Sequence, residues 1–244
     1  MFRAAHIIIL NKNHRHIFLT SMRSRLFFSV LFLYACNNVS DNKALLPVAP
    51  ENSKTQVINL EGGLGIVSIS LPGRYDTTFT WIHYSDCGKP CERRKYRFQP
   101  AILPAYPETG FFYQPLKDSI EQFTIVHSPY IPVDDSDNTD DQTFITSFHD
   151  HKKFEITHNP ALRVIKSDTI EKIGDRYFSI IVIDIHDTAK AQYSKKLLST
   201  TTIRRGTIDF NFELLTKKKD SSAEKFINNA KYYLRTIRIS AATK

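Results

Sequence analysis

Residues 176–186 read RYFSIIVIDIH, and apolar side chains occupy both alternating sets of positions in this stretch. Because successive side chains of a β-strand point to opposite faces, such a strand must be covered on both sides. The stretch therefore predicts a central strand that is buried between two layers of the fold.

Two runs of alternating apolar and polar residues follow, at 196–204 and 207–215, around the turn pair Arg205-Gly206. Alternating runs joined by such a pair are typical of a β-hairpin. In the second run one predicted face holds Ile208, Phe210, Phe212 and Leu214, and the other holds Thr207, Asp209, Asn211 and Glu213. Further strands are predicted at residues 67–71, 79–84, 95–99, 111–114, 120–127, 143–148 and 153–157.

An amphipathic helix is predicted near the end of the chain. Its apolar residues recur at helical spacing and share one face: Ala223, Phe226, Ile227, Ala230, Tyr233, Leu234 and Ile237. Ser221 and Glu224 have the spacing of a capping box, which predicts where the helix begins. The predicted fold class is therefore α+β, a predominantly antiparallel sheet with this C-terminal helix packed on it, in one domain over residues 55–240.

Two segments of this predicted domain carry a family resemblance. Ile69-Ser70-Leu71-Pro72 looks like the early strand of the PsbP-like fold, which ends in a proline turn, and residues 226–240 look like its final helix and strand. The resemblance covers residues 65–240 and implies a PsbP-like sandwich. Photosystem extrinsic subunits and a Ran-binding import factor share that fold. Its members are mostly non-enzymatic assembly or binding modules, so the resemblance implies binding rather than catalysis.

A short apolar run, residues 26–35, follows Arg23-Ser24-Arg25 near the start of the chain. A membrane span needs about 20 apolar residues, so the run predicts the core of a signal peptide instead. Its ending, Leu33-Tyr34-Ala35-Cys36, resembles the lipobox of bacterial lipoproteins, although Tyr34 stands where that family has a small residue. Met22 lies directly before the charged segment and is the expected start of translation.

The lipobox resemblance implies that residues 1–35 are a signal peptide and that Cys36 is lipidated and becomes the new amino terminus. Residues 36–54 are polar, contain Pro47 and Pro50 and show no periodicity, so they predict a lipidated flexible tether. The chain is therefore expected to be anchored through Cys36 to a membrane of the bacterial cell envelope. The domain would face the periplasm or the outside.

The net charge of +8 comes mostly from the predicted signal. Residues 1–35 hold five of the 33 basic residues and no acidic one, which leaves 28 basic against 25 acidic residues, a net +3. A domain that binds nucleic acid is usually strongly basic. Nucleic acid is therefore not predicted as a partner.

Cys87 and Cys91 are the two thiols that remain once the lipobox cysteine is modified. An even pair in an oxidising compartment predicts a disulfide, and Gly88 and Pro90 favour a turn that brings the two Cα atoms within reach. Two alternatives stay open. A zinc site with His83 would need a helix, which Gly88 and Pro90 oppose, and redox catalysis usually has two residues between its thiols rather than three.

A cationic run lies at and after the cysteines, at Lys89, Arg93, Arg94, Lys95 and Arg97. Clustered cations can bind an acidic partner or a lipid head group. Lys89, Arg93, Arg94 and Arg97 are therefore the candidate partner-binding residues. The alternative is an ordinary solvated strand face.

Other polar clusters give weaker indications. Residues 134–141 hold five aspartates but lack the glycine and closing glutamate of an EF-hand, so they predict a solvated loop. His149-Asp150-His151, with His158 and Asp184-Ile185-His186, lacks a spacing that forces convergence on a metal or a reacting group. The chain has no glycine-rich phosphate loop, nucleophile elbow or zincin motif. The sequence therefore predicts no catalytic residue, no metal site and no cofactor.

These features favour a non-enzymatic, membrane-tethered domain that binds an envelope protein or ligand, such as an accessory subunit of a larger assembly. Two alternatives stay open: an envelope enzyme with a His/Asp-based site, and an immunity lipoprotein that neutralises a toxin. The expected partners are the membrane, through Cys36, and an envelope protein.

Overall fold

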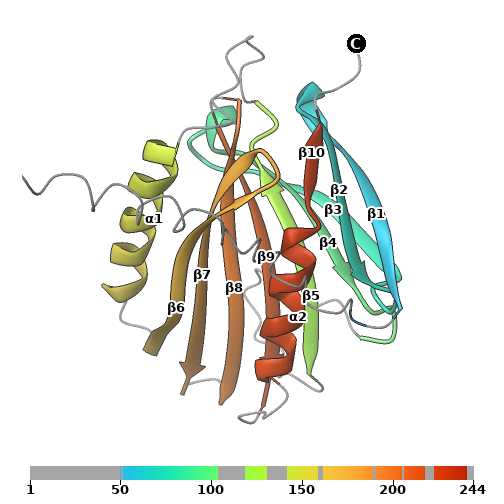
Figure 1. Ribbon diagram of the computed structural model, residues 1–244, viewed down its shortest axis with the longest axis vertical. Helices are drawn as coiled ribbons and strands as arrows, with labels where there is room; N and C mark the ends of the chain where they lie inside the picture. The colour runs from blue at the N-terminus through green and yellow to red at the C-terminus, as the bar shows by residue number, and fades with distance from the viewer. Residues whose placement is uncertain are drawn as a thin grey trace, which may run out of the picture. The chain divides into compact units, whose positions relative to one another are not determined.

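The alternating segments of the sequence assemble into two antiparallel sheets in the computed structural model (Figure 1). The structure describes Pro50 and residues 52–103, 119–130, 142–158, 162–188, 191–204, 206–217 and 223–240. Within these ranges the small sheet has the strand order β1-β2-β10, and the large sheet has the order β3-β4-β5-β9-β8-β7-β6.

The small sheet comprises β1 (Ser53–Leu60), β2 (Gly65–Pro72) and β10 (Arg238–Ser240). The large sheet comprises β3 (Thr77–His83), β4 (Arg93–Gln99), β5 (Ile120–His127), β6 (Leu162–Ile173), β7 (Arg176–Asp187), β8 (Gln192–Ile203) and β9 (Gly206–Thr216). Two helices are described, α1 (Gln142–Thr157) and α2 (Ala223–Arg235). None of the helices within the described ranges is long and apolar enough to cross a membrane.

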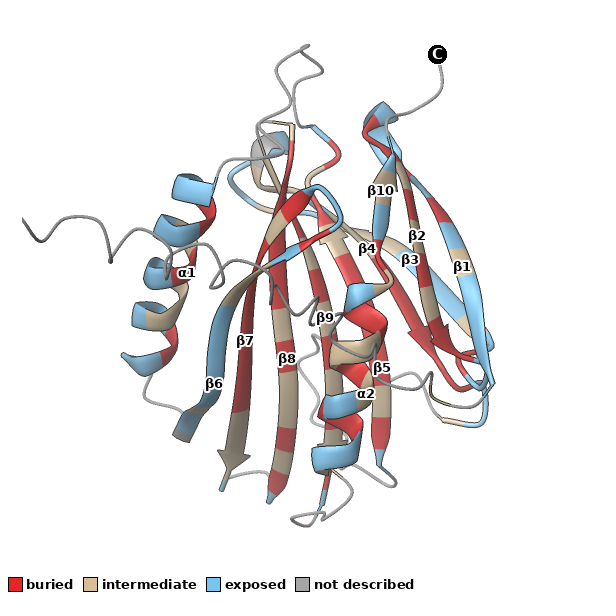
Figure 2. Ribbon diagram, viewed as in Figure 1, coloured by how far each residue is buried: buried red, intermediate tan, exposed pale blue. Residues whose placement is uncertain are grey.

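The predicted α+β class is confirmed, because α2 packs on an antiparallel sheet. Its buried residues are Phe226, Ile227, Ala230, Tyr233 and Leu234, five of the seven residues of the predicted stripe. Ala223 is partly buried, and Ile237 is buried but lies after the end of the helix at Arg235. They join residues of both sheets in the main core, and the exposed side of α2 faces away from the strands (Figure 2). The predicted capping residue Ser221 lies outside the described residues.

The predicted hairpin is also confirmed. Strands β8 and β9 pair antiparallel, and Ile203 pairs with Gly206. Gly206 therefore belongs to β9 and not to the turn, where the sequence placed it. On β9 the residues Ile208, Phe210, Phe212 and Leu214 are buried in the main core. The polar residues between them therefore point to the opposite face of the large sheet.

Strand β7 is covered on both faces, as predicted, but it is not central. Phe178 and Ile180 lie in the main core, while Ile181 and Ile183 form a second cluster with Ile156 of α1. The strand is second from the edge of the large sheet, next to β6. The apolar residues on its outer face are explained by α1, which covers this end of the sheet.

The prediction of two strands at residues 143–148 and 153–157 is wrong, because both belong to α1. The buried residues of α1 are Ile145, His149 and Ile156, which are four and seven residues apart, so they share one face of a helix. Phe144 and Phe154 are exposed on other sides of the helix. Because apolar residues lie on several sides of α1, its helical stripe is weak. The short alternating patterns in the same residues therefore favoured strands.

Two further differences concern a missed strand and a domain boundary, and one predicted strand is not tested. Strand β6 was not predicted, because it is an edge strand with mostly polar, exposed residues. Strand β1 begins at Ser53, so Ser53 and Lys54 belong to the domain and not to the predicted tether. The predicted strand at residues 111–114 lies outside the described residues.

Candidate functional site

The face of the large sheet opposite the main core carries rows of paired polar side chains. On β9, Asn211 lies between Thr124 of β5 and Leu198 of β8, and Arg97 of β4 pairs with Thr124 on the far side. Side chains that are directly opposite in neighbouring strands lie about 5 Å apart and contact each other. The register therefore brings residues far apart in sequence into one continuous surface.

Two adjoining hollows lie on this face. The larger has a volume of about 320 Å³, and its described lining residues are Lys95, Arg97, Ile120, Gln122, Thr124, Val126, Lys196, Leu198, Asn211, Glu213 and Leu215. The smaller, about 260 Å³, is lined by residues of α1, β6, β7, β8 and β9, among them Lys152, Ser179, Thr200 and Asp209. Lys196, Leu198 and Asn211 line both hollows. We call this joint surface the groove.

Glu213 is the centre of a polar network in the groove. Its carboxylate accepts hydrogen bonds from Gln122 Nε2 at 2.9 Å and Ser194 Oγ at 3.0 Å, and Lys196 Nζ lies 2.8 Å from Oε1. Burial opposes ionisation of Glu213, but the positive charge of Lys196 and the hydrogen bonds from Lys196, Gln122 and Ser194 lower its pKa below the ordinary value. The groove therefore holds a fixed carboxylate at neutral pH.

Gln122 is buried in the groove, with 7% of its surface exposed, and it has an unused acceptor. Its Nε2 must face Glu213, because a carboxylate only accepts hydrogen bonds, and this fixes the direction of Oε1. Gln122 Oε1 has no hydrogen-bond partner in the part of the chain that the structure describes. Leaving a buried acceptor unpaired costs about 1–3 kcal/mol, so a ligand with a donor would be stabilised here.

The only tryptophan of the chain, Trp81, lies at the β4 side of the groove. The Arg97 guanidinium carbon is 4.9 Å from the centre of its ring, and Lys95 Nζ is 5.9 Å from it. Cations at this distance over an indole are attracted by the negative face of the ring. Trp81 therefore makes cation–π contacts with two of the cations that line the groove.

Asp209 of β9 is another acid of the groove, in the lining of the smaller hollow. Burial raises the pKa of Asp209, although the hydrogen bond from Thr200 Oγ1 at 2.6 Å and the positive charges of Lys152 and Arg93 oppose this. A carboxyl group whose pKa is raised by folding is stabilising while protonated. Its contribution is complete below the ordinary pKa of 3.8 and is lost as the pH rises through the folded-state value.

Replacing Asp209 with asparagine is therefore expected to stabilise the protein at neutral pH. The amide keeps an acceptor for Thr200 and carries no charge, so we expect a gain of about 1 kcal/mol in the free energy of unfolding. Urea denaturation at neutral pH measures the gain. The same experiment below pH 3.8 is the control, because the wild-type carboxyl is then protonated and the two proteins should agree. A loss at neutral pH would show that the charge stabilises the fold.

Helix α1 is attached to the sheet by a chain of hydrogen bonds that begins at two buried residues, His149 and Ser179. His149 Nδ1 lies 2.8 Å from Ser179 Oγ on β7, and His149 Nε2 lies 3.3 Å from Asp168 Oδ2 on β6. Lys153 also forms an ion pair with Asp168, and its hydrogen bond is the main reason why the pKa of Asp168 is lowered. The four side chains hold α1 over β6 and β7.

These residues have the Ser-His-Asp composition of a hydrolase triad, but not its presentation. Ser179 lies within a strand and is 2% exposed, and His149 is 5% exposed. A nucleophilic serine usually stands on a sharp turn that offers its hydroxyl to a substrate. The arrangement is therefore first a structural anchor for α1.

The other histidines that the sequence singled out do not converge on His149. His151 is exposed and pairs with Glu155 at 3.2 Å, one turn along α1. His158 stacks on Phe154 at the end of the helix, and His186 stacks on Tyr193 of β8. In the described ranges, no three His, Cys, Asp or Glu side chains come together in a way that would hold a metal ion.

The structure separates the predicted cationic residues. Lys89 and Arg93 are exposed, and Lys89 Nζ lies 5.6 Å from the centre of the Tyr130 ring. Arg94 is half-buried and pairs with Glu61 at 2.8 Å, whereas Arg97 is 4% exposed and lies in the groove. The four candidate residues therefore do not form one exposed surface, because Arg94 points to the face of β4 opposite Arg93 and Arg97, and Arg97 is buried.

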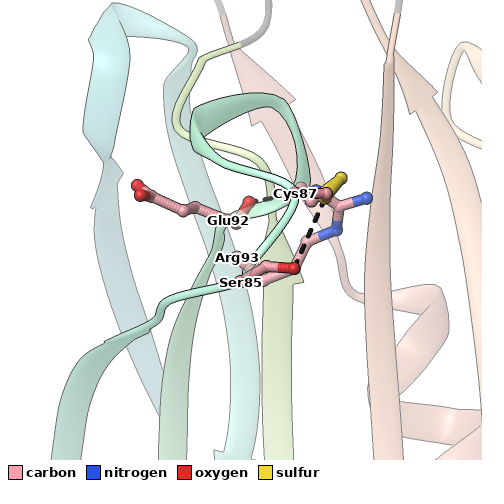
Figure 3. The surroundings of a disulfide bond; sticks show 5 residues. Ser85, Cys87, Glu92 and Arg93 are labelled. Carbon is pink, nitrogen blue, oxygen red and sulfur yellow. Dashed lines mark hydrogen bonds between the residues drawn. A yellow bond between two sulfur atoms is a disulfide. The ribbon is translucent and has the colours of Figure 1, made fainter.

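The cysteine pair lies in the loop between β3 and β4 (Figure 3). Cys87 and Cys91 are at disulfide distance, with their Cα atoms 5.9 Å apart. Gly88 has a φ of 83°, which other residues rarely adopt, and a single 3₁₀ turn, Lys89–Cys91, completes the loop. Ser85 Oγ is 3.4 Å from Cys87 Sγ, and Arg93 donates a hydrogen bond to the Glu92 carbonyl at 3.0 Å.

Replacing Cys87 and Cys91 together with serine is expected to lower the melting temperature only modestly. A crosslink across four residues contributes at most about 2 kcal/mol by restricting the unfolded chain. It also preorders the loop that carries Lys89, so recovery of a partner bound there should weaken. Thermal unfolding and pull-down from membranes measure the two effects. Free thiols in the exported protein, or unchanged partner recovery, would contradict this prediction.

Sequence patterns indicated the polar face of β9 but not the groove. Asp209, Asn211 and Glu213 were expected to share the face of β9 opposite its apolar residues, and they line the groove on that face. Gln122 and Lys196 were not singled out, because neither belongs to a recognisable motif. A polar residue in the middle of an otherwise buried strand, such as Gln122 in β5, is the signal that would have identified them.

Comparison with known proteins assigns no family to this chain. No protein-family model matches it, and no curated protein matches it in sequence. Its function must therefore be inferred from its own residues and their geometry.

Proposed function

We propose that the chain is a bacterial envelope lipoprotein, anchored through Cys36, whose domain binds a ligand or protein partner in the groove of the large sheet. The observation that carries this proposal is Gln122, a buried side chain that lines the groove with an unpaired acceptor. The apolar run and the lipobox-like ending at Cys36 support the anchor. The proposal assigns no catalysis to the domain.

The construction of the groove also favours binding. Its polar groups stand on strands β4, β5, β8 and β9, which are held by continuous antiparallel pairing. Side chains on strands are held more precisely than those on loops, which lowers the ordering cost of binding. The larger hollow, about 320 Å³, has the volume of a small ligand site.

Photo-cross-linking in intact cells tests this proposal. A photoreactive amino acid at Asn211, in the groove, should join the lipoprotein to a partner or ligand, and one at Lys225, an exposed residue of α2, should not. Purified lipoprotein added in excess should compete for the partner or ligand and reduce cross-linking. The variant Leu198→Trp, in which the groove is altered, should not compete. Equal products from both positions, or none from Asn211, would refute binding in the groove. A captured toxin would favour the immunity alternative.

A hydrolase is the second candidate function, because Ser179, His149 and Asp168 form a hydrogen-bonded chain beside the smaller hollow. A fluorophosphonate probe distinguishes the two functions, because an activated serine attacks its phosphorus, displaces fluoride and becomes phosphonylated. We expect no labelling of the wild-type protein, since Ser179 is buried. Labelling at Ser179 that disappears in His149→Ala would favour the enzyme.

A further inference from the structure

Strand β3 forms one edge of the large sheet (Figure 1). Within the described residues it pairs with β4 alone, so the backbone N–H and C=O groups on its outer side belong to no ladder there. Thr78 and Thr80 are exposed on one face of β3, and Phe79 and His83 are exposed on the other. The edge is therefore open to a further strand on both faces.

Strand β3 differs in charge from the other sheet edges. The part of the chain that the structure describes has three more edges, and each of them carries a basic residue: Lys54 in β1, Arg238 in β10 and Lys166 in β6. Lys or Arg on an edge strand is a common device against pairing with another chain. The seven residues of β3, TTFTWIH, include no Lys, Arg, Asp or Glu. Thr, Phe, Trp and Ile favour strands, so the composition of β3 suits pairing and does not oppose it.

The sequence of β3 also fits a second copy of itself. When two copies run antiparallel with Thr80 opposite Thr80, all seven residues are paired. Phe79 of each copy then lies opposite Trp81 of the other copy, on the face of the groove. The other pairs bring no like charges together: Thr78 with Ile82 and Thr77 with His83. Aromatic pairs and pairs of β-branched residues stabilise neighbouring strands, so the edge complements itself.

We infer that two copies of this chain associate through β3, antiparallel about a two-fold axis at Thr80. A two-fold axis brings the same surface of both copies together, and here it joins the two large sheets into one continuous sheet. The axis of an antiparallel strand pair is perpendicular to the sheet, so both grooves lie on the same side. One strand from each copy makes a small interface, below about 1,200 Å², so the dimer is weak and reversible. This association does not depend on what the groove binds.

Cysteine cross-linking of the full-length chain in mild detergent tests the pairing and its register. Thr80→Cys places two thiols directly opposite each other, where the Cβ atoms are about 5 Å apart, so mild oxidation should give a disulfide-linked dimer. Thr77→Cys is the control on the same strand. Its two copies would be six residues apart along the pair, about 20 Å, and should not cross-link. Thr169→Cys, at an exposed threonine of the edge strand β6, should give no dimer either.

Charged residues at the axis test the pairing without a cross-link. Thr80→Lys and Thr80→Glu each place two like charges opposite each other, so either variant alone should associate at least about tenfold more weakly than the wild type. An equal mixture of the two variants should recover the association, because opposite charges then meet at the axis. Sedimentation equilibrium in density-matched detergent measures the association constants. Thr80 is exposed, so both variants should fold, and circular dichroism checks this.

Three results would overturn the inference. The first is the absence of a Thr80→Cys dimer, or equal dimers from all three cysteine variants. The second is a mixture of the two charged variants that associates no better than either alone. The third comes from oxidation in intact cells: if Thr80→Cys is linked to a different protein and not to itself, β3 accepts a strand of that protein. Cross-linking at Asn211 tests the groove separately, so the two proposals can fail independently.

Discussion

Replacing Phe226 with alanine is expected to lower the free energy of unfolding by about 3 to 5 kcal/mol. Phe226 lies on the buried side of α2 and belongs to the main core, where the helix contacts β2, β8 and β9. Removing the ring loses its burial and leaves a cavity that strands of two sheets cannot readily close. Urea denaturation at neutral pH measures the loss.

Lys225→Ala is the matched control, one residue away on the exposed side of the same helix. Both substitutions place alanine in α2, so their difference reports packing and not helix propensity. The control should change the free energy of unfolding by less than about 0.5 kcal/mol. Similar small losses at both positions would show that α2 contributes little to the core.

Replacing Cys36 with serine is expected to remove the protein from the membrane fraction or to leave an unprocessed precursor. The lipobox resemblance implies that the Cys36 thiol receives a diacylglyceryl group before cleavage, and serine has no sulfur to accept it. Two or three acyl chains give a stable anchor, so losing them should change the location of nearly all molecules. Fractionation of cells followed by immunoblotting measures this.

Mass spectrometry of the membrane-extracted wild-type protein completes the test. Its chain should begin at an acylated Cys36, without residues 1–35. A soluble product, or a chain that retains Arg23 and an unmodified Cys36, would contradict the lipoprotein hypothesis. The start of translation is testable in the same sample. If Met22 is the initiating residue, any unprocessed precursor should lack residues 1–21.

The groove and the anchor are independent parts of the proposal. The anchor depends on a local motif around Cys36, whereas the groove depends on side chains of four strands, such as Gln122 and Lys196. A soluble wild-type protein would therefore refute the lipid anchor at Cys36 and leave the binding site standing. The likeness to the PsbP-like fold stays a prediction, and neither the anchor nor the groove depends on it.

Local patterns determined several features of this protein from the sequence alone. The stripe from Ala223 to Ile237 predicted α2 and its buried side, and the alternating runs around Arg205-Gly206 predicted the β8–β9 hairpin. Cys87 and Cys91 were expected within reach of each other, and they are. Each of these features depends on residues that are close in sequence, so the period of the pattern or the length of the loop is enough to predict it.

The tertiary structure alone decided the rest. Segments that alternate over five or six residues became one helix, α1, because Ile145, His149 and Ile156 pack against the sheet. The groove joins Arg97, Gln122, Asn211 and Lys196, which only the order and register of β4, β5, β9 and β8 bring together. Periodicity tells which face of a strand a residue occupies, but neighbours across strands follow from sheet order. Burial of Arg97 and the unpaired acceptor of Gln122 therefore became visible only in the folded chain.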